Sequence, residues 1–263
     1  MRGDPDRTWW ERHARRFRKH AGFITAAVLG QVLVRSFVPE DVLRSANEVG
    51  GNFLQTFGGM YGIILAFAMY VVWQQHNETQ VAVEREAVSL TELYRILGWF
   101  GSWKGRDAVR ASLKRYATLV PETVGHEPTE AERRLIAAGL AEFLGHAPAT
   151  PTEVRLFEPA LELFHELNEA REHRITIARL RLPEGLRWFV YIGGVLGVST
   201  LWLLYVDAWL VQALFTAVMT WVVVATVSII VDLDDPYSGD FIVDWKRFRE
   251  AAAQMEAPPP AGP

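Results

Sequence analysis

The chain has 263 residues, of which 50% are hydrophobic and 22% charged, with a formal net charge of −4. Its mean hydropathy of +0.06 is typical of a protein that joins apolar segments to a charged part. The small charge gives no reason to expect a nucleic-acid partner, and the absence of cysteine excludes disulfides, thiol nucleophiles and cysteine-ligated zinc.

The first apolar segment, residues 21–34, is short for a membrane span, because a bilayer core of ~30 Å requires about 20 apolar residues. A signal peptide would have a similar length, but no small-residue cleavage site follows. We expect a membrane helix in which Arg35 snorkels toward the headgroups.

The second apolar segment, residues 53–73, carries no charge and continues without a break into a polar stretch. From Ile63 to Ile96 there is neither proline nor glycine, which predicts one helix that crosses the membrane and extends into water to Leu97. Four glutamates are expected to line this extension: Glu78, Glu84, Glu86 and Glu92.

The stretch up to Pro183 predicts further amphipathic helices and no strand. The first amphipathic stretch, 83–97, is the continuation of the second helix itself, and further helices are expected at 106–120, 129–144 and 150–182. Capping-box patterns begin at Thr129 and Thr150 and mark the starts of the last two. Two more apolar segments, 188–206 and 208–231, are separated by little more than Asp207, which predicts a tight membrane hairpin with this acid at its tip.

An acidic turn follows the fourth span. Its residues are Asp234, Asp235, Pro236, Tyr237, Gly239 and Asp240. Several carboxylates so close together suit calcium, but they lack the spacing of an EF-hand loop, and a turn stabilised by aspartate and glycine is favoured. No cofactor or metal is predicted apart from this weak case for calcium. The proline-rich end, residues 258–263, is expected to be a disordered tail.

Basic residues predict the orientation of the spans. Five lie between residues 12 and 19 and three between 246 and 249, whereas the connection between the first two spans has one arginine against three acids. We expect a multi-pass protein of the inner (cytoplasmic) membrane with both termini in the cytoplasm.

The predicted fold class is all-α, with four transmembrane helices and a helical cytoplasmic domain inserted between the second and third. The corresponding segments are 1–73, 74–186, 187–231 and 232–263.

No catalytic constellation stands out, so the sequence does not predict an enzyme. His165 resembles the start of a two-histidine zinc motif, but Glu169 occupies the second histidine position. The glycines of the second span lie in an apolar helix and not in a phosphate-binding loop.

The second span carries two candidate faces. A small-residue face contains Gly58, Gly62 and Ala66. It would let helices approach closely, either within the chain or between copies. An apolar stripe beside it contains Ile63, Phe67 and Val71. Several copies of this stripe would form a pore neck that gates by dewetting, although ordinary lipid or bundle contacts explain the same spacing. The inner mouth of such a pore would be lined by Tyr70, Gln74 and Glu78.

Three local patterns, in this order, resemble the bestrophin-like membrane family, much of which is classed as a domain of unknown function. They are Val-Trp-Gln-Gln-His-Asn-Glu at 72–78, Arg-Ala-Ser-Leu-Lys-Arg-Tyr-Ala at 110–117 and Asp-Pro-Tyr-Ser-Gly-Asp at 235–240.

The resemblance implies a homopentameric channel for small inorganic ions, usually anions, embedded in membrane lipid, with an apolar neck made by the second helix. Alignment on Trp73 would instead turn Gly59 and Ile63 toward the pore. Hydrophobic residues follow Asp240, where the family has further acids, so the resemblance does not carry calcium gating over to this chain. The alternative is a non-conducting membrane scaffold or sensor whose cytoplasmic helices bind a partner.

Overall fold

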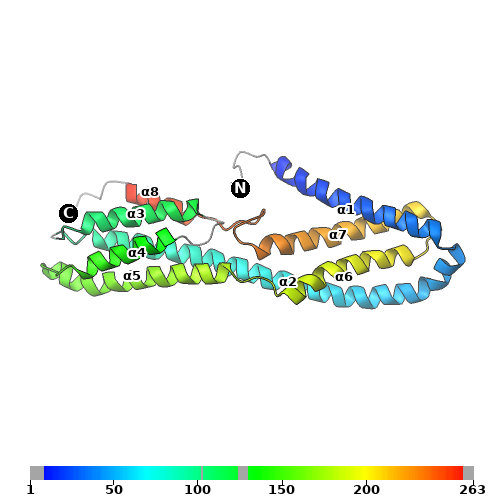
Figure 1. Ribbon diagram of the computed structural model, residues 1–263, viewed down its shortest axis with the longest axis horizontal. Coiled ribbons are helices and arrows are strands. Elements are labelled where there is room, and N and C mark those ends of the chain that lie inside the picture. Colours follow the sequence, from blue (N-terminus) through cyan, green and yellow to red (C-terminus); the bar gives the residue numbers. More distant parts are fainter. Residues whose placement is uncertain (1–8, 102, 124–129, 257–263) are drawn as a thin grey trace. The chain divides into compact units, whose positions relative to one another are not determined.

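A computed structural model describes residues 9–101, 103–123 and 130–256, with side chains described from His20 onward. The elements are α1 (Trp9–Phe37), α2 (Glu40–Leu97), α3 (Arg106–Glu122), α4 (Glu130–Leu144), α5 (Pro151–Ala178), α6 (Glu184–Leu203), α7 (Trp209–Asp234) and α8 (Lys246–Glu256) (Figure 1). Over these described ranges every regular element is a helix and none is a strand, which confirms the all-α prediction.

The chain divides into two compact units. The membrane unit contains residues 1–72 and 182–231, and the bundle unit contains residues 73–181 and 232–263. Four helices are long and apolar enough to cross a membrane: α1, α2, α6 and α7. The segment that follows α7 therefore packs with the helices that follow the second span.

Helix α2 is longer than the apolar run predicted, because it begins at Glu40, directly after Pro39. Glu40 and Asp41 lie in its first turn, where negative charge is favourable. Gly50 and Gly51 do not interrupt the helix. An added Cβ at Gly50 would lie 3.1 Å from the Leu204 side chain, so the glycine lets the α6 end approach closely.

Two hydrogen bonds set the pairing of α1 with α7. His20 Nε2 lies 3.2 Å from Ser228 Oγ, and Arg35 Nη1 donates to Gln212 Oε1 at 3.0 Å. Residue numbers rise along α1 as they fall along α7, so the two helices run antiparallel. Arg35 also donates to the Val206 carbonyl at 3.0 Å, so its guanidinium is bonded to the connection between α6 and α7. The hairpin offers it acceptors that the hydrocarbon core of a bilayer does not.

Helix α2 is fixed against α6 by polar contacts at two levels. The Tyr61 hydroxyl donates to the Val190 carbonyl at 2.7 Å, and the ring lies where Gly193 leaves space. Near the other end, the Asn47 amide exchanges two hydrogen bonds with the Tyr205 backbone, at 2.9 and 2.7 Å. These contacts fix which face of α2 turns inward.

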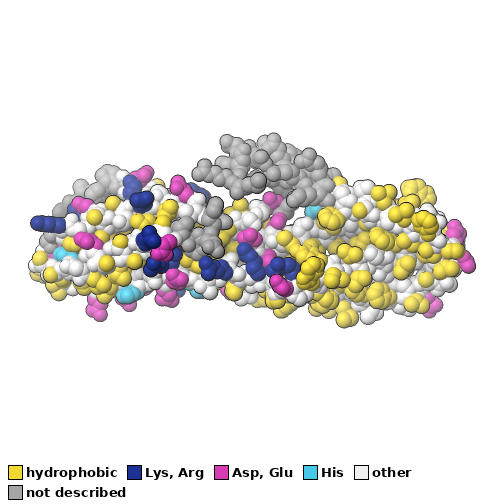
Figure 2. All heavy atoms as spheres, viewed as in Figure 1, with side chains coloured by type: hydrophobic (Ala, Val, Ile, Leu, Met, Phe, Trp, Pro, Cys, Tyr) yellow, Lys and Arg dark blue, Asp and Glu magenta, His cyan; other side chains and the backbone are white. Residues whose placement is uncertain are grey.

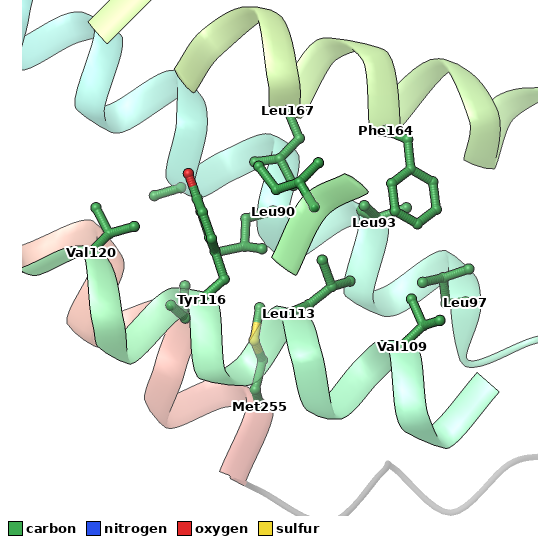
Figure 3. Packing of buried hydrophobic residues seen from close by; sticks show 14 of the residues in the cluster. Leu90, Leu93, Leu97, Val109, Leu113, Tyr116, Val120, Phe164, Leu167 and Met255 are labelled. Atoms are coloured by element: carbon green, nitrogen blue, oxygen red, sulfur yellow. The ribbon is translucent and has the colours of Figure 1, made fainter. Parts of the chain in front are cut away.

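The bundle unit closes around a hydrophobic core to which α2, α3, α5 and α8 each contribute (Figure 3). Leu90, Leu93 and Leu97 of α2 point toward Leu113 of α3 and Phe164 of α5. All five are at most 1% exposed. The apolar side of the amphipathic stretch predicted at 83–97 therefore faces this core.

The two predicted helix starts, at Thr150 and Thr129, have different outcomes. Thr150 caps α5, since its Oγ1 accepts from the Glu153 N–H at 3.2 Å, as the capping pattern predicts. Thr129 lies outside the described residues, as does the expected tail at 258–263. Helix α8 was not expected, although Phe248, Ala251 and Met255 repeat at helical spacing and are all buried.

Candidate functional site

One face of α2 in the membrane unit is largely exposed. Ile63 is 73% exposed, Phe67 58% and Tyr70 63%, and these positions fall on one side of the helix. Val71 is half-buried on the flank of this face, and Gly59 lies on it. The predicted apolar stripe is therefore centred on Ile63 and Phe67. We call these residues, with Tyr70, the outer face of α2.

The opposite side of α2 carries the contacts that hold the helix in place. Tyr61 is 5% exposed, and Ala68 and Val72 are fully buried. Phe53, Phe57 and Tyr61 also stack in series, with ring centroids 5.5 and 5.7 Å apart. Because these groups occupy the inner side, the outer face cannot turn inward without breaking the Tyr61 contacts.

The predicted small-residue face has no close neighbour among the described residues of the protomer. A Cβ added at Gly58 or Gly62 would meet nothing within 4 Å, and Ala66 is exposed. Close contacts at glycine occur elsewhere in the membrane unit. A Cβ on Gly193 would lie 2.5 Å from the Tyr61 ring, and one on Gly30 would lie 2.6 Å from the Trp202 ring. Sequence spacing had not indicated these two positions.

In the bundle unit, the continuation of α2 carries an exposed polar row. Gln74 donates to the Glu78 carboxylate at 3.0 Å, and both side chains are exposed, as are Glu84 and Glu92. Glu86 differs, because it is fully buried. The expectation that Glu86 lines the extension with the other glutamates is therefore wrong.

Glu86 belongs to a buried charge network that the sequence did not predict. Arg174 of α5 donates to its carboxylate through Nε at 2.5 Å and Nη2 at 3.3 Å. Arg174 Nη2 also donates to Glu132 at 3.2 Å, and the Tyr116 hydroxyl donates to Glu86. Arg171 lies 3.7 Å from Glu132. Two arginines thus face two carboxylates, which reduces the cost of burying each charge.

This network shifts the protonation of its own members. Burial, followed by the charge of Glu86, raises the pKa of the Tyr116 hydroxyl well above 10. For Arg174, burial acts to lower the pKa, but Glu86 and Tyr116 outweigh it and raise the pKa further. Both groups therefore keep their protons at neutral pH. The carboxylate of Glu132, the last residue of the capping-box pattern that begins at Thr129, belongs to this network.

The acidic turn after α7 is held by an arginine and by its own backbone. Arg181 donates to the Asp234 carbonyl at 2.6 Å and lies 3.2 Å from the Asp235 carboxylate. The same carboxylate accepts from the Tyr237 N–H at 3.2 Å. Gly239 has φ of 85°, a conformation that favours glycine.

The remaining contacts complete the turn on the bundle unit. The Pro236 carbonyl accepts from the Val243 N–H at 3.0 Å, and the Tyr237 ring packs 6.0 Å from Trp245. Asp240 is exposed. Within the described ranges no group of three or more histidine, aspartate or glutamate side chains is arranged to hold a metal ion.

The connection between α6 and α7 carries a second cluster that sequence reasoning missed. The guanidinium carbons of Arg35 and Arg44 lie 4.7 and 4.4 Å from the Tyr205 ring centroid. Arg44 also pairs with Asp207, the residue expected at the hairpin tip. A cation over an aromatic ring is favourable, so this cluster fixes the hairpin to α1 and α2.

Hydrophobic and charged side chains occupy different parts of the protein surface. Figure 2 shows hydrophobic side chains over α6, α7 and the first half of α2, and charged side chains over α3, α4 and α5. Large exposed apolar residues of the membrane unit include Leu210, Leu214 and Phe215. An apolar surface of this kind is typical of contact with lipid.

Comparisons with known proteins agree with this architecture. A sequence model described as the Bestrophin-like domain matches residues 21–248. No curated protein matches the chain by sequence. A crystal structure of a bacterial bestrophin homolog from Klebsiella pneumoniae is similar, with a TM-score of 0.69 at 13% identity, over 89% of this chain and 96% of the other. A variant of that homolog with a tryptophan replaced by alanine gives a TM-score of 0.72 at 11% identity, over 91% and 96%.

Proposed function

The chain belongs to the bestrophin-like family of membrane proteins, and on this premise we propose that several copies form an ion channel. The outer face of α2 carries the proposal. It is apolar and exposed in the membrane unit, and α2 continues into the bundle unit with the exposed polar side chains of Gln74, Glu78 and Glu92. A helix with such a face in every copy would line a passage around a symmetry axis.

In the proposed channel, the neck is formed by Ile63, Phe67 and Val71 of each copy. Phe67 would project furthest toward the axis, and Val71 would lie at the margin because it is half-buried. A ring of such side chains is impermeable when it is narrow, since ions cannot shed their water against apolar groups. Gly58, Gly62 and Ala66 would support close packing between copies.

The inner mouth would be formed by Tyr70, Gln74 and Glu78. The hydrogen bond from Gln74 to Glu78 holds both polar groups on the exposed side of α2. Beyond them, Glu84 and Glu92 would line the vestibule with Arg85 and Arg95 interspersed. This mixture of signs gives a vestibule close to neutral, so we expect weak selection by charge in this region.

We further propose that the chain crosses a bacterial-type inner membrane four times, with the bundle unit and both termini on the cytoplasmic side. The support is the number of long apolar helices and the basic residues beside them. Family resemblance favours five copies.

Ion flux from reconstituted vesicles tests the neck. Phe67→Ala should raise the flux above that of the wild-type protein, because it shortens a side chain at the constriction. Phe215→Ala is the matched control, since Phe215 lies on α7 with a similar exposure of 60%. Equal flux in Phe67→Ala and wild type would remove Phe67 from the neck, as would an equal increase in both variants.

The mass of the detergent-solubilised protein tests the assembly. A channel of this design requires several copies of the 29.7 kDa chain. A monomer without flux would contradict the channel and support the non-conducting scaffold or sensor. Recording under a salt gradient would then give the sign of the permeant ion from the reversal potential.

A further inference from the structure

The register between α1 and α7 brings polar residues of three helices into one buried layer. The contacts His20–Ser228 and Arg35–Gln212 lie near opposite ends of the pair, and the residue numbers in each add to nearly the same value. Antiparallel helices with this register place Gln31 opposite Thr216, one turn from Arg35 and Gln212.

Helix α6 adds an indole to the same layer. The Trp202 ring lies against Gly30, whose added Cβ would be 3.0 Å from Cε2, the ring carbon bonded to Nε1. Gly30 directly precedes Gln31 in α1. The Trp202 N–H is therefore close to the level at which Gln31 meets α7.

Gln31 and Thr216 are buried and Trp202 is half-buried, and one polar atom of each lacks a partner within the described protein. Gln31 is 2% exposed and Thr216 is fully buried. Gln31 Oε1, Thr216 Oγ1 and Trp202 Nε1 are all inaccessible and make no hydrogen bond to described residues. Other threonines in these helices do bond within their helix: Thr200 Oγ1 donates to the Leu196 carbonyl at 2.9 Å and Thr220 Oγ1 to the Thr216 carbonyl at 2.6 Å.

Leaving all three groups unpaired would be costly in this environment. In a membrane the surrounding hydrocarbon offers no hydrogen bonds, so a buried polar group requires a partner inside the protein. The inventory of the layer is complementary, because the indole only donates, the amide oxygen only accepts, and the hydroxyl does both. One water molecule can serve all three, since it has two donors and two acceptors.

We propose that the layer formed by Gln31, Trp202 and Thr216 is a binding site for a single buried water. The water accepts from Trp202 Nε1–H, donates to Gln31 Oε1, and exchanges its remaining bond with the Thr216 hydroxyl. It joins α1, α6 and α7 inside the membrane unit, on the level next to the Arg35–Gln212 bond. The site is independent of conduction and of the number of copies.

The sign of a stability change tests this site. Thr216→Val keeps the volume of the side chain but removes the hydroxyl. If the hydroxyl binds the water, its loss should lower the apparent Tm of the full protein by at least about 2–4 °C. If the hydroxyl is unpaired, the same change removes an uncompensated polar group and should raise the Tm, which would overturn the proposal.

Thr220→Val is the matched control, one turn further along α7. Its hydroxyl bonds only to its own helix, where the carbonyl keeps its main-chain donor, so a Tm change smaller than that of Thr216→Val is expected. An equal fall in both variants would indicate a general effect of threonine in α7 and would contradict a specific site.

Direct observation provides an independent measurement that does not depend on how the variants fold. A high-resolution map of the wild-type protein should show a density peak at roughly 2.7–3.2 Å from Gln31 Oε1, Trp202 Nε1 and Thr216 Oγ1. A direct hydrogen bond between two of these side chains, with no peak between them, would overturn the proposal.

Discussion

The guanidinium of Arg174 and the carboxylate of Glu86 form a buried two-point ion pair between α5 and α2, at 2.5 and 3.3 Å. Glu132 of α4 shares the same guanidinium, and the pair is also bonded by Tyr116 of α3. Four helices of the bundle unit therefore meet at one polar junction inside an otherwise apolar core. Removing either charged partner would leave the other buried, charged and without water.

Arg174→Met is expected to destabilise the bundle unit by about 3–5 kcal/mol, since it leaves two buried carboxylates without their main partner. Denaturant unfolding followed by circular dichroism measures this change. Arg155→Met is the control, because Arg155 lies on the same helix and is exposed. A similar loss in both variants would show that the pair contributes nothing particular.

High pH should destabilise the bundle unit through Tyr116. Its pKa is raised in the folded state, chiefly by burial and then by Glu86. In the unfolded chain the pKa of a tyrosine hydroxyl is about 10. At lower pH the folded and unfolded states both keep the proton, so the stability that Tyr116 contributes is fully present. Above this pKa the unfolded chain releases the proton first, and the stability falls as the pH rises. Tyr116→Phe should flatten the fall of Tm between pH 10 and 11; an unchanged slope would exclude Tyr116 as its source.

Alanine at Gly193 is expected to disturb the contact between α2 and α6. The new Cβ would lie 2.5 Å from a ring carbon of Tyr61, so the ring or the helix must move. Such overpacking costs about 1–3 kcal/mol. Gly58→Ala is the matched control within α2, since its Cβ meets nothing within 4 Å and alanine favours helix. Thermal unfolding of both variants should show a lower Tm for Gly193→Ala alone.

Leucine at Gly62 should weaken the assembly without affecting the protomer. Among the described residues of the protomer, nothing lies within 4 Å of a Cβ at this position, whereas neighbouring copies would approach closely there under the channel proposal. Light scattering in detergent should show a smaller particle for Gly62→Leu. Gly22→Leu is the control, because Gly22 of α1 is equally free of neighbours. A full-sized particle for Gly62→Leu would place the contact between copies elsewhere.

Periodicity and the lack of breakers were sufficient to predict α2 through the second span to Leu97. They did not indicate its start at Glu40, because the segment from Glu40 to Asn52 carries charges and contains Gly50 and Gly51. The contact of Gly50 with Leu204 and the bonds of Asn47 to Tyr205 show why the helix tolerates them. A tertiary contact of this kind overrides local propensity and has no local signature.

The charges were harder to predict than the helices. Glu86 and Glu84 look alike in sequence, yet only Glu86 faces Arg174, which is 88 residues away along the chain. Arg35 was expected to reach for lipid headgroups, whereas the hairpin of α6 and α7 provides its partners. In each case the partner belongs to a distant segment, and a single sequence does not show which segments meet.

The core of the bundle unit has a consequence for biosynthesis. Trp245, Phe248 and Met255 are part of this core, yet they are encoded after α6 and α7. The ribosome makes them after both of these helices, so the core of the nascent bundle is incomplete while the two apolar helices are made. Until then Leu90, Leu113 and Tyr116 lack part of their cover. Completion of this unit therefore waits for the synthesis of α8, and a chain truncated before α8 should be a substrate for chaperones and proteases.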